Sequence, residues 1–322
     1  MAKVLNIVNG DVTVEIIRSA YINGDFLAWG DFLHEGYVPF TSSLEELSNI
    51  RARYISKQGF DSFENIRKKF QERDNRLKKY HHYQKIILWF EPDLYDQLQL
   101  IQILSWFANQ NIENINLTLI SVNHYLKESS PRGIRMLLGD EESVTREHLE
   151  VAQKAWLAFI QPTPMDWFKL LDEDLSYLPF LKDAIIRMLE EFPNRRDGLS
   201  RSQYQALYII SKGINNPKYI FDKSQTLEKK RFMGEIIFWK ILDEFIENRV
   251  ISSQKNGQIL TITPLGRDIL NQNINYLHIK PINKWIGGTK LKNSNLWCWD
   301  SKNRTIKRYY YSKVLSSLLP FR

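Results

Sequence analysis

Residues 85–93 read Lys-Ile-Ile-Leu-Trp-Phe-Glu-Pro-Asp, a continuous apolar run that ends at a Glu-Pro-Asp turn. A strand that is apolar on both of its faces is typical of a parallel sheet covered by helices on each side. Apolar residues at helical spacing follow at 94–109, and a further strand is predicted at 116–122. This stretch therefore predicts an α/β fold.

The first thirty residues show the same alternation of strand and helix. Residues 4–8 are mostly apolar, residues 12–20 carry apolar side chains at helical spacing, and residues 25–29 form a second strand candidate. A crossover of this kind makes the two strands parallel neighbours. Two helices, at 43–57 and 61–80, then lead to the strand described above.

This order of elements predicts a short, doubly wound, mostly parallel sheet. Numbered along the chain, the four strands are expected in the spatial order 2-1-3-4, because the chain of such sheets starts in the middle. The switch point then lies between the first and third strands. Ligands of open α/β sheets bind outside the carboxyl ends of the strands at such a point.

The rear of the chain has a helical pattern followed by a winged-helix-like pattern. The second pattern consists of a helix at 200–212, a long apolar helix at 227–248, a hairpin around Asn256-Gly257 and a last helix at 264–271. The expected domains are a Rossmann-like α/β domain at 1–140, a helical connector at 141–194, a winged-helix-like domain at 195–283, and an aromatic-rich C-terminal segment at 284–322 that packs on the body.

Composition favours a soluble protein of about two domains. The chain has 322 residues, of which 43% are hydrophobic, and domains usually have ~100–200 residues. No apolar run reaches the ~18–20 residues that span a bilayer, and the N-terminus lacks the apolar core of a signal peptide. The single cysteine, Cys298, has no intrachain disulfide partner. We therefore expect a reducing compartment, a cytoplasmic location and no membrane partner.

Charge is unevenly distributed along the chain. Residues 1–194 carry 21 Lys/Arg and 28 Asp/Glu, a net charge of −7, whereas residues 195–322 carry 23 and 9, a net charge of +14. A basic rear part is compatible with an anionic partner such as nucleic acid, and also with a surface that is merely well solvated.

Polar side chains follow three of the predicted strands. Asn9, Gly10 and Asp11 follow the first, Asp31, His34 and Glu35 the second, and Glu91, Asp93, Asp96 and Gln97 the third. Because the carboxyl ends of parallel strands meet at one edge, these sets should converge there. Carboxylates that share a pocket raise each other's pKa values or hold a cation. Oxygen-rich clusters suit Mg²⁺ or Mn²⁺, and one histidine among carboxylates suits general acid–base catalysis.

The enzyme hypothesis assigns a role to each of these residues. Asp11, Asp31 and Glu91 would hold Mg²⁺ or Mn²⁺, and the catalytic group would be His34, Asp31 and Glu35. A small phosphate-bearing ligand, such as a nucleotide, would contact Asn9, Gly10, Asp11, Glu91, Asp93, Asp96 and Gln97. The expected reaction class is hydrolysis or transfer at a phosphoester.

Simpler structural roles are also open for several of these residues. Asn9-Gly10-Asp11 is compatible with a tight strand-to-helix turn in which Asp11 is the helix N-cap, and Asp93 is compatible with the N-cap of the helix at 94–109. The loop at 31–36 is different, since a loop rich in Asp, His and Glu gains nothing from packing and loops often carry function.

Eight motifs stand out together. The N-terminal motifs are Asn6-Ile7-Val8-Asn9-Gly10-Asp11, Trp29-Gly30-Asp31-Phe32-Leu33-His34-Glu35-Gly36 and Leu88-Trp89-Phe90-Glu91-Pro92-Asp93-Leu94-Tyr95-Asp96-Gln97-Leu98-Gln99. The rear motifs are Gly198-Leu199-Ser200-Arg201, Phe232-Met233-Gly234-Glu235, Leu265-Gly266-Arg267, Trp285-Ile286-Gly287-Gly288 and Trp297-Cys298-Trp299-Asp300. Together they resemble a bacterial family of uncharacterised proteins, domain-of-unknown-function family 1835. The resemblance covers most of the chain and implies its architecture, and the family brings no assigned reaction.

Two non-catalytic classes of function stay open beside the enzyme. One is a ligand-sensing regulator whose winged-helix region contacts nucleic acid through Lys229, Lys230, Arg231 and Lys255. The other is an interaction protein that uses the same basic region to contact a protein partner. Nucleic acid is not favoured, because the long helix is apolar on most sides and also carries carboxylates, which repel phosphate.

Overall fold

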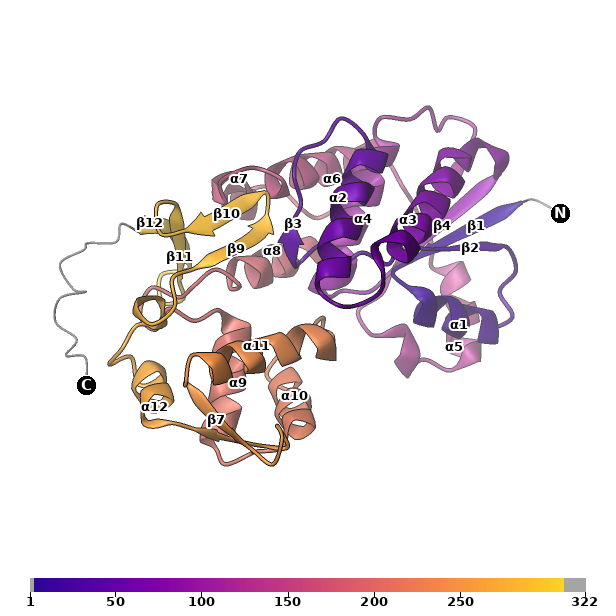
Figure 1. The fold of residues 1–322 in the computed structure, drawn as a ribbon. Coiled ribbons are helices and arrows are strands. Elements are labelled where there is room, and N and C mark those ends of the chain that lie inside the picture. Colours follow the sequence, from indigo (N-terminus) through magenta and orange to yellow (C-terminus); the bar gives the residue numbers. More distant parts are fainter. Residues whose placement is uncertain (1–2, 310–322) are drawn as a thin grey trace. The chain divides into compact units, whose positions relative to one another are not determined.

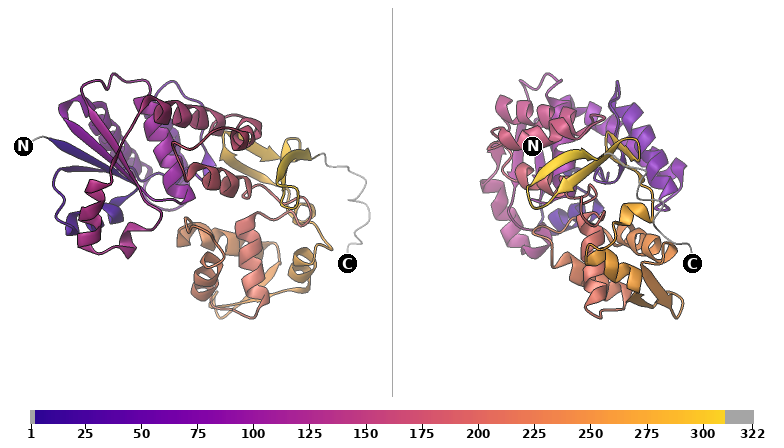
Figure 2. Two further views of the ribbon diagram at one scale, coloured as in Figure 1. Left: turned by 180° about the vertical axis from the view of Figure 1, so that it is seen from behind. Right: turned by 90° about the vertical axis from the view of Figure 1, so that its left-hand side faces the viewer.

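The computed structural model describes residues 3–309 and divides the chain into two compact units (Figures 1 and 2). Unit 1 consists of Met1–Ile185 and Trp285–Thr289, and unit 2 consists of Ile186–Lys284 and the residues from Lys290 onward. The helical connector predicted at 141–194 is therefore not a separate body. Its residues as far as Ile185 belong to unit 1, and the division falls within helix α8 (Leu181–Leu189).

Unit 1 is built on a five-stranded, mostly parallel sheet. Its strands, in spatial order, are β2 (Asp25–Ala28), β1 (Val4–Val8), β4 (Lys85–Phe90), β5 (Asn116–Ser121) and β6 (Glu142–Ser143). The first four are parallel to one another and are the four strands recognised in the sequence. The fifth, β6, pairs antiparallel with β5, and a strand of two residues is too short to produce a detectable alternation in the sequence.

Helices cover both faces of this sheet (Figures 1 and 2). The helices of unit 1 that precede α8 are α1 (Asp11–Ser19), α2 (Leu44–Lys57), α3 (Phe63–Lys78), α4 (Leu94–Phe107), α5 (Pro131–Met136), α6 (Arg146–Phe159) and α7 (Met165–Lys169). On one face, Val14 and Ile17 of α1 and Ile134 of α5 share a buried cluster with Trp89 of β4. Helices α3 and α4 lie on the other face, with α2 packed on α3 and α6 packed on α4.

Side-chain caps fix where these helices begin. Ser43 and Ser62 accept hydrogen bonds from backbone amides in the first turns of α2 and α3, and Asp93 does the same for α4. Helix α4 is buried along nearly its whole length, because the sheet covers one side and α6 the other. Its polar residues therefore need partners inside the protein, and Gln102 Oε1 accepts a hydrogen bond from Trp29 Nε1 at 2.7 Å.

A second, three-stranded sheet joins distant parts of the sequence. Its order is β10 (Thr289–Lys292), β9 (Asn283–Gly287) and β3 (Gly36–Tyr37), and β3 pairs in parallel with β9 at Ile286 and Gly287. The Tyr37 and Trp285 rings lie 3.9 Å apart. Trp285 of the aromatic-rich segment thus belongs to unit 1, whereas residues 310–322 of that segment lie outside the described residues.

Unit 2 contains a run of helices interrupted by a hairpin. Its further elements are α9 (Arg201–Ser211), α10 (Pro217–Gln225), α11 (Glu235–Glu247), β7 (Ile251–Gln254), β8 (Ile259–Ile262), α12 (Pro264–Leu270), β11 (Leu296–Asp300) and β12 (Thr305–Tyr309). The helix predicted at 227–248 begins only at Glu235, because residues 227–234 form a loop that ends at the N-cap Gly234. Helix α10 was not predicted, although its cap Asn216 and the following Pro217 are a recognised helix start. Within the described residues, none of the helices combines the length and the apolar character needed to cross a bilayer.

Candidate functional site

The turns after β1 and β4 meet through the side chain of Asp96. Asn9 Nδ2 donates to Asp96 Oδ1 at 2.7 Å, and the backbone amide of Glu91 donates to Asp96 Oδ2 at 2.6 Å. Asp96 lies in the first turn of α4 and is fully buried. A single carboxyl group therefore ties together the carboxyl ends of the two strands at the switch point of the sheet.

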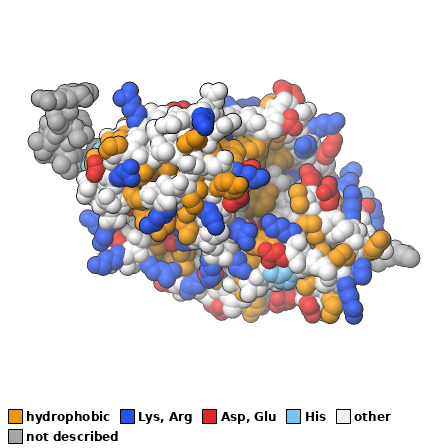
Figure 3. Space-filling model, turned by 90° about the horizontal axis from the view of Figure 1, so that it is seen from below, with side chains coloured by type: hydrophobic (Ala, Val, Ile, Leu, Met, Phe, Trp, Pro, Cys, Tyr) orange, Lys and Arg blue, Asp and Glu red, His pale blue; other side chains and the backbone are white. Residues whose placement is uncertain are grey.

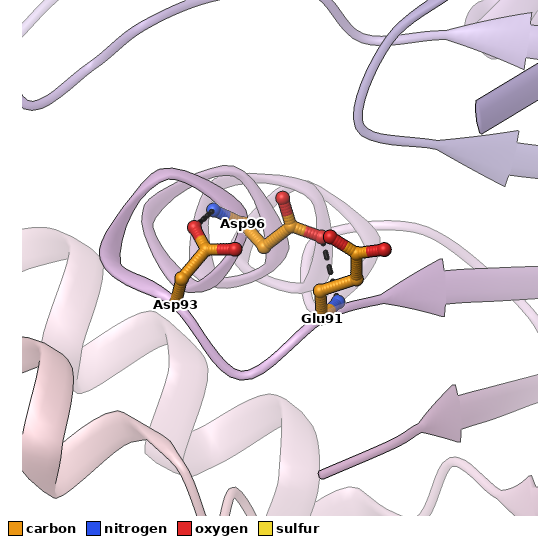
Figure 4. Close-up of side chains that lie close together, drawn as sticks. All are labelled: Glu91, Asp93 and Asp96. Atoms are coloured by element: carbon orange, nitrogen blue, oxygen red, sulfur yellow. Dashed lines mark hydrogen bonds between the residues drawn. The ribbon is translucent and has the colours of Figure 1, made fainter. Parts of the chain in front are cut away.

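Three carboxyl groups gather at this place, as Figure 4 shows. Glu91, Asp93 and Asp96 each offer one oxygen, and these oxygens all lie within 4.8 Å of one another. The three residues are at most 8% exposed. Within residues 3–309, none of them forms an ion pair with a basic side chain. All three residues are among the ligand contacts that the sequence predicts, and Asp93 is also the N-cap of α4, in line with the alternative interpretation.

Burial raises the pKa of all three carboxyl groups. Desolvation is the main cause for each, and the neighbouring carboxylates add to it for Asp93 and Asp96. The pKa of Asp93 rises to about 7, and that of Asp96 rises well above its ordinary value. Backbone amides oppose the rise by donating to Glu91 and Asp93. Near neutral pH the cluster therefore holds protons or needs a cation.

The donor set fits a hard divalent cation. Oxygen ligands lie about 2.0–2.6 Å from Mg²⁺ or Ca²⁺, so that two ligands of one ion are at most about 5 Å apart. The spacing of the three oxygens meets this condition. The two capping hydrogen bonds of Asp93 both use Oδ1, and Leu126 donates to Glu91 through Oε1 only. Each of these two residues thus has a second carboxylate oxygen for a ligand.

The structure does not bring the predicted metal set of Asp11, Asp31 and Glu91 together in one cluster. Asp31 pairs with Arg51 at 2.8 Å, and both side chains are almost completely buried. Asp11 is exposed and occupies the first position of α1. Only Glu91 belongs to the cluster that the described residues contain. The alternative that Asp11 is the N-cap was wrong, because Gly10 holds that position with no side-chain cap.

Arg51 is the residue that the sequence analysis missed. Besides pairing with Asp31, it donates to the carbonyl oxygens of Phe32, Glu35 and Tyr37 at 2.8–3.2 Å. It thereby holds the whole loop after β2 in one conformation. Its place on α2 amid apolar positions is a signal of burial, but nothing in the sequence indicates its partner. Asp31 consequently has a structural role as the counter-ion of Arg51.

The loop after β2 nevertheless reaches the other two turns. The His34 ring lies 6.0 Å from the Tyr95 ring, edge-on, and Tyr95 Oη donates to the Asn9 carbonyl at 3.1 Å. His34 is only 5% exposed. The neighbouring Glu35 hydrogen-bonds Tyr54, whose pKa rises because of burial and this carboxylate. Tyr95, in the first turn of α4, therefore contacts residues of the turns after β1 and β2.

The remaining predicted contact residues have backbone roles. Gln97 Nε2 donates to the Glu91 carbonyl at 2.9 Å. A Cβ added to Gly10 would lie 3.7 Å from Tyr95 Oη, an ordinary contact distance. Gln97 therefore holds the turn after β4 beside the carboxylate cluster, whereas the space around Gly10 does not require glycine.

The basic residues proposed for nucleic acid lie in unit 2, in loops. Lys229, Lys230 and Arg231 belong to the loop before α11 and not to its first turn. Lys255 is exposed at the tip of the β7–β8 hairpin, where its φ is +49°. Figure 3 shows Lys and Arg side chains spread among hydrophobic and uncharged ones over the visible face, without a single continuous basic stripe.

A scan against protein-family models found no match to this chain, and a search of curated proteins found no relative. The resemblance to family 1835 therefore stays a prediction.

Proposed function

We propose that unit 1 binds a divalent cation at Glu91, Asp93 and Asp96 and acts on a phosphate-bearing ligand at the carboxyl edge of its sheet. The observation that carries the proposal is the burial of three carboxyl groups within 4.8 Å, none of them ion-paired within residues 3–309. Buried like charges raise the free energy of the native state unless protons or a cation neutralise them. Mg²⁺ or Mn²⁺ would neutralise this cluster and leave positions for ligand oxygens.

The reaction class that suits such a site is hydrolysis or transfer at a phosphoester. A bound divalent cation would supply electrophilic stabilisation of phosphate oxygens. Asn9 and Gln97 would keep the turns in place through their hydrogen bonds to Asp96 and to the Glu91 carbonyl. His34 is the candidate proton donor or acceptor, because its loop, held by Arg51, reaches Tyr95 at the same edge.

Thermal unfolding with and without cations tests the binding step. Saturating Mn²⁺ or Mg²⁺ should raise the Tm of the wild-type chain by several degrees, since a ligand at about 100 times its Kd adds roughly 2.7 kcal/mol. Asp93→Asn and Glu91→Gln should abolish the rise. Glu113→Gln changes an exposed carboxylate outside the cluster and should leave it intact. An equal rise in all four proteins would refute the site.

Turnover is tested separately with a chromogenic phosphomonoester and phosphodiester. Manganese-dependent release of the chromophore that disappears in Asp93→Asn would support the enzyme. Cation binding without turnover of either ester, or of nucleoside triphosphates, would favour the ligand-sensing alternative.

A second candidate function concerns unit 2. We propose a winged-helix-like element for the order α9, α10, α11, β7, β8, α12. In its support, the backbone N–H of Leu260 in β8 donates to the carbonyl of Asn215 in the α9–α10 connection. The exposed positions of α11 include Glu235, Asp243 and Glu247, which would repel DNA phosphates. We therefore favour packing or protein contact for this element, and salt-dependent binding of an arbitrary DNA duplex would reverse that preference.

A further inference from the structure

A groove of about 810 Å³ follows the outer edge of the unit 1 sheet. Strand β2 forms that edge, and residues 26–30 line one side of the groove while α3 lines the other. The groove extends from Asp11, near the carboxyl end of β2, to Lys3 and Tyr83 near its other end. It is separate from the carboxylate cluster, which lies between β1 and β4.

The backbone of β2 presents hydrogen-bonding groups to this groove. Trp29 N–H donates to the Val8 carbonyl of β1 at 2.9 Å. Since backbone groups alternate in direction along a strand, those of Phe26 and Ala28 point away from β1. The hydrogen bond from Arg76 Nη1 to the Phe26 carbonyl, at 2.8 Å, agrees with this direction. An edge of this kind is a template for an added strand.

The groove also concentrates positive charge on a part of the chain that is acidic overall. Its charged lining residues are the cations Lys3, Lys69, Arg73, Arg76 and Lys79 and the carboxylates Asp11, Asp61 and Glu72. Residues 1–194 as a whole carry a net charge of −7. Lys3, Lys69 and Arg73 pair with Asp25, Asp61 and Asp74. Within residues 3–309, Arg76 and Lys79 form no ion pair, and both are exposed. An acidic partner is therefore favoured, and two copies of this basic edge would repel each other.

We propose that the groove binds an extended acidic peptide segment of a partner protein, which pairs with β2 as an additional strand. Main-chain hydrogen bonds to Ala28 would hold the segment, and acidic side chains on one face of it would reach Lys69, Arg76 and Lys79 on α3. A nucleic-acid strand fits less well, because each nucleotide brings a phosphate that the carboxylates in the lining would repel. A peptide can place uncharged residues opposite those carboxylates.

Fluorescence anisotropy of the full chain with a short fluorescein-labelled peptide of alternating valine and glutamate tests this proposal. Binding should weaken as NaCl is added. Lys79→Glu and Lys69→Glu should each weaken it by about threefold to tenfold. Lys68→Glu is the matched control, because Lys68 is an exposed neighbour on α3 that does not line the groove, and it should bind like the wild type.

Two further measurements separate strand addition from simple charge attraction. The same peptide N-methylated at alternate residues cannot form the ladder and should not bind. Ala28→Pro removes the outward N–H at an edge position where proline is tolerated and should weaken binding while circular dichroism shows an unchanged fold. The proposal is overturned if the wild-type chain does not bind the peptide saturably, if the N-methylated peptide binds equally well, or if oligo(dT) binds as tightly.

Discussion

At the residue scale, the carboxyl group of Asp96 does most to shape the candidate site. It accepts hydrogen bonds from Asn9 and from the Glu91 amide, so it fixes the positions of two strand ends at once. The same burial that makes these bonds strong places three carboxyl groups together in a dry environment. The native state is therefore most stable when protons or a cation occupy the site. The free energy of unfolding should consequently depend on pH.

The pH dependence of stability without cations follows from the raised pKa values. A carboxyl group whose pKa is higher in the native state than in the unfolded state holds its proton more tightly in the native state. Its contribution to stability is complete at low pH and is lost as pH rises through the native pKa, which is about 7 for Asp93. The free energy of unfolding of the chain in EDTA should thus fall by about 1–3 kcal/mol between pH 5 and pH 8.

Asp93→Asn provides the matched variant for this prediction. Asparagine keeps the helix cap but carries no charge, so urea unfolding in EDTA should show a smaller fall with pH and a more stable protein at pH 8. A steeper fall in the variant than in the wild type would contradict the account.

At the element scale, the regular parts of unit 1 were predictable and its irregular connections were not. Residues 85–90 form a strand because a continuous apolar run between turn residues fits a strand covered on both faces. Strands β3 and β6 have two residues each, too few for any period to show. Their existence depends on tertiary partners, such as β9 for β3.

The candidate site was predictable to the same extent. The sequence located the polar turns, because turns must follow the apolar strands, and it named Glu91, Asp93 and Asp96 as ligand contacts. It assigned Asp31 to metal binding and did not pair it with Arg51. No local signal in a sequence indicates which aspartate a buried arginine on a distant helix will contact. The helix predicted at 227–248 is longer than the observed helix α11. The prediction extends the apolar periodic pattern, which runs from 235 onward, back through residues 227–234, which form a loop.

A pair of glycine substitutions tests the packing of β3. Gly36 and Gly59 both have positive φ, +78° and +81°, so alanine should strain the backbone similarly at either position. A Cβ at Gly36 would lie 2.3 Å from the Tyr54 ring, whereas one at Gly59 would meet nothing within 4 Å. Thermal unfolding should show Gly36→Ala to be less stable than Gly59→Ala by roughly 1–3 kcal/mol. Equal Tm values would mean that β3 tolerates displacement.

At the scale of the whole molecule, the chain joins an acidic α/β unit to a basic helical unit. The proposed cation site and the β2 groove both belong to unit 1, and helices α9–α12 with the β7–β8 hairpin belong to unit 2. Cation binding should therefore stabilise one unit selectively. Hydrogen exchange followed by mass spectrometry should show Mn²⁺-dependent protection of β4 and α4, and little change in α9–α12. Equal protection of both units would contradict a site confined to the β1–β4 edge.

Calorimetric titration with Mn²⁺ at pH 8 tests the central claim most directly. We predict one Mn²⁺ ion per wild-type chain, weaker binding at pH 6 because protons compete for Asp93, and no detectable binding by Asp93→Asn. Binding that is the same in the variant, or that is equally strong at both pH values, would contradict the account.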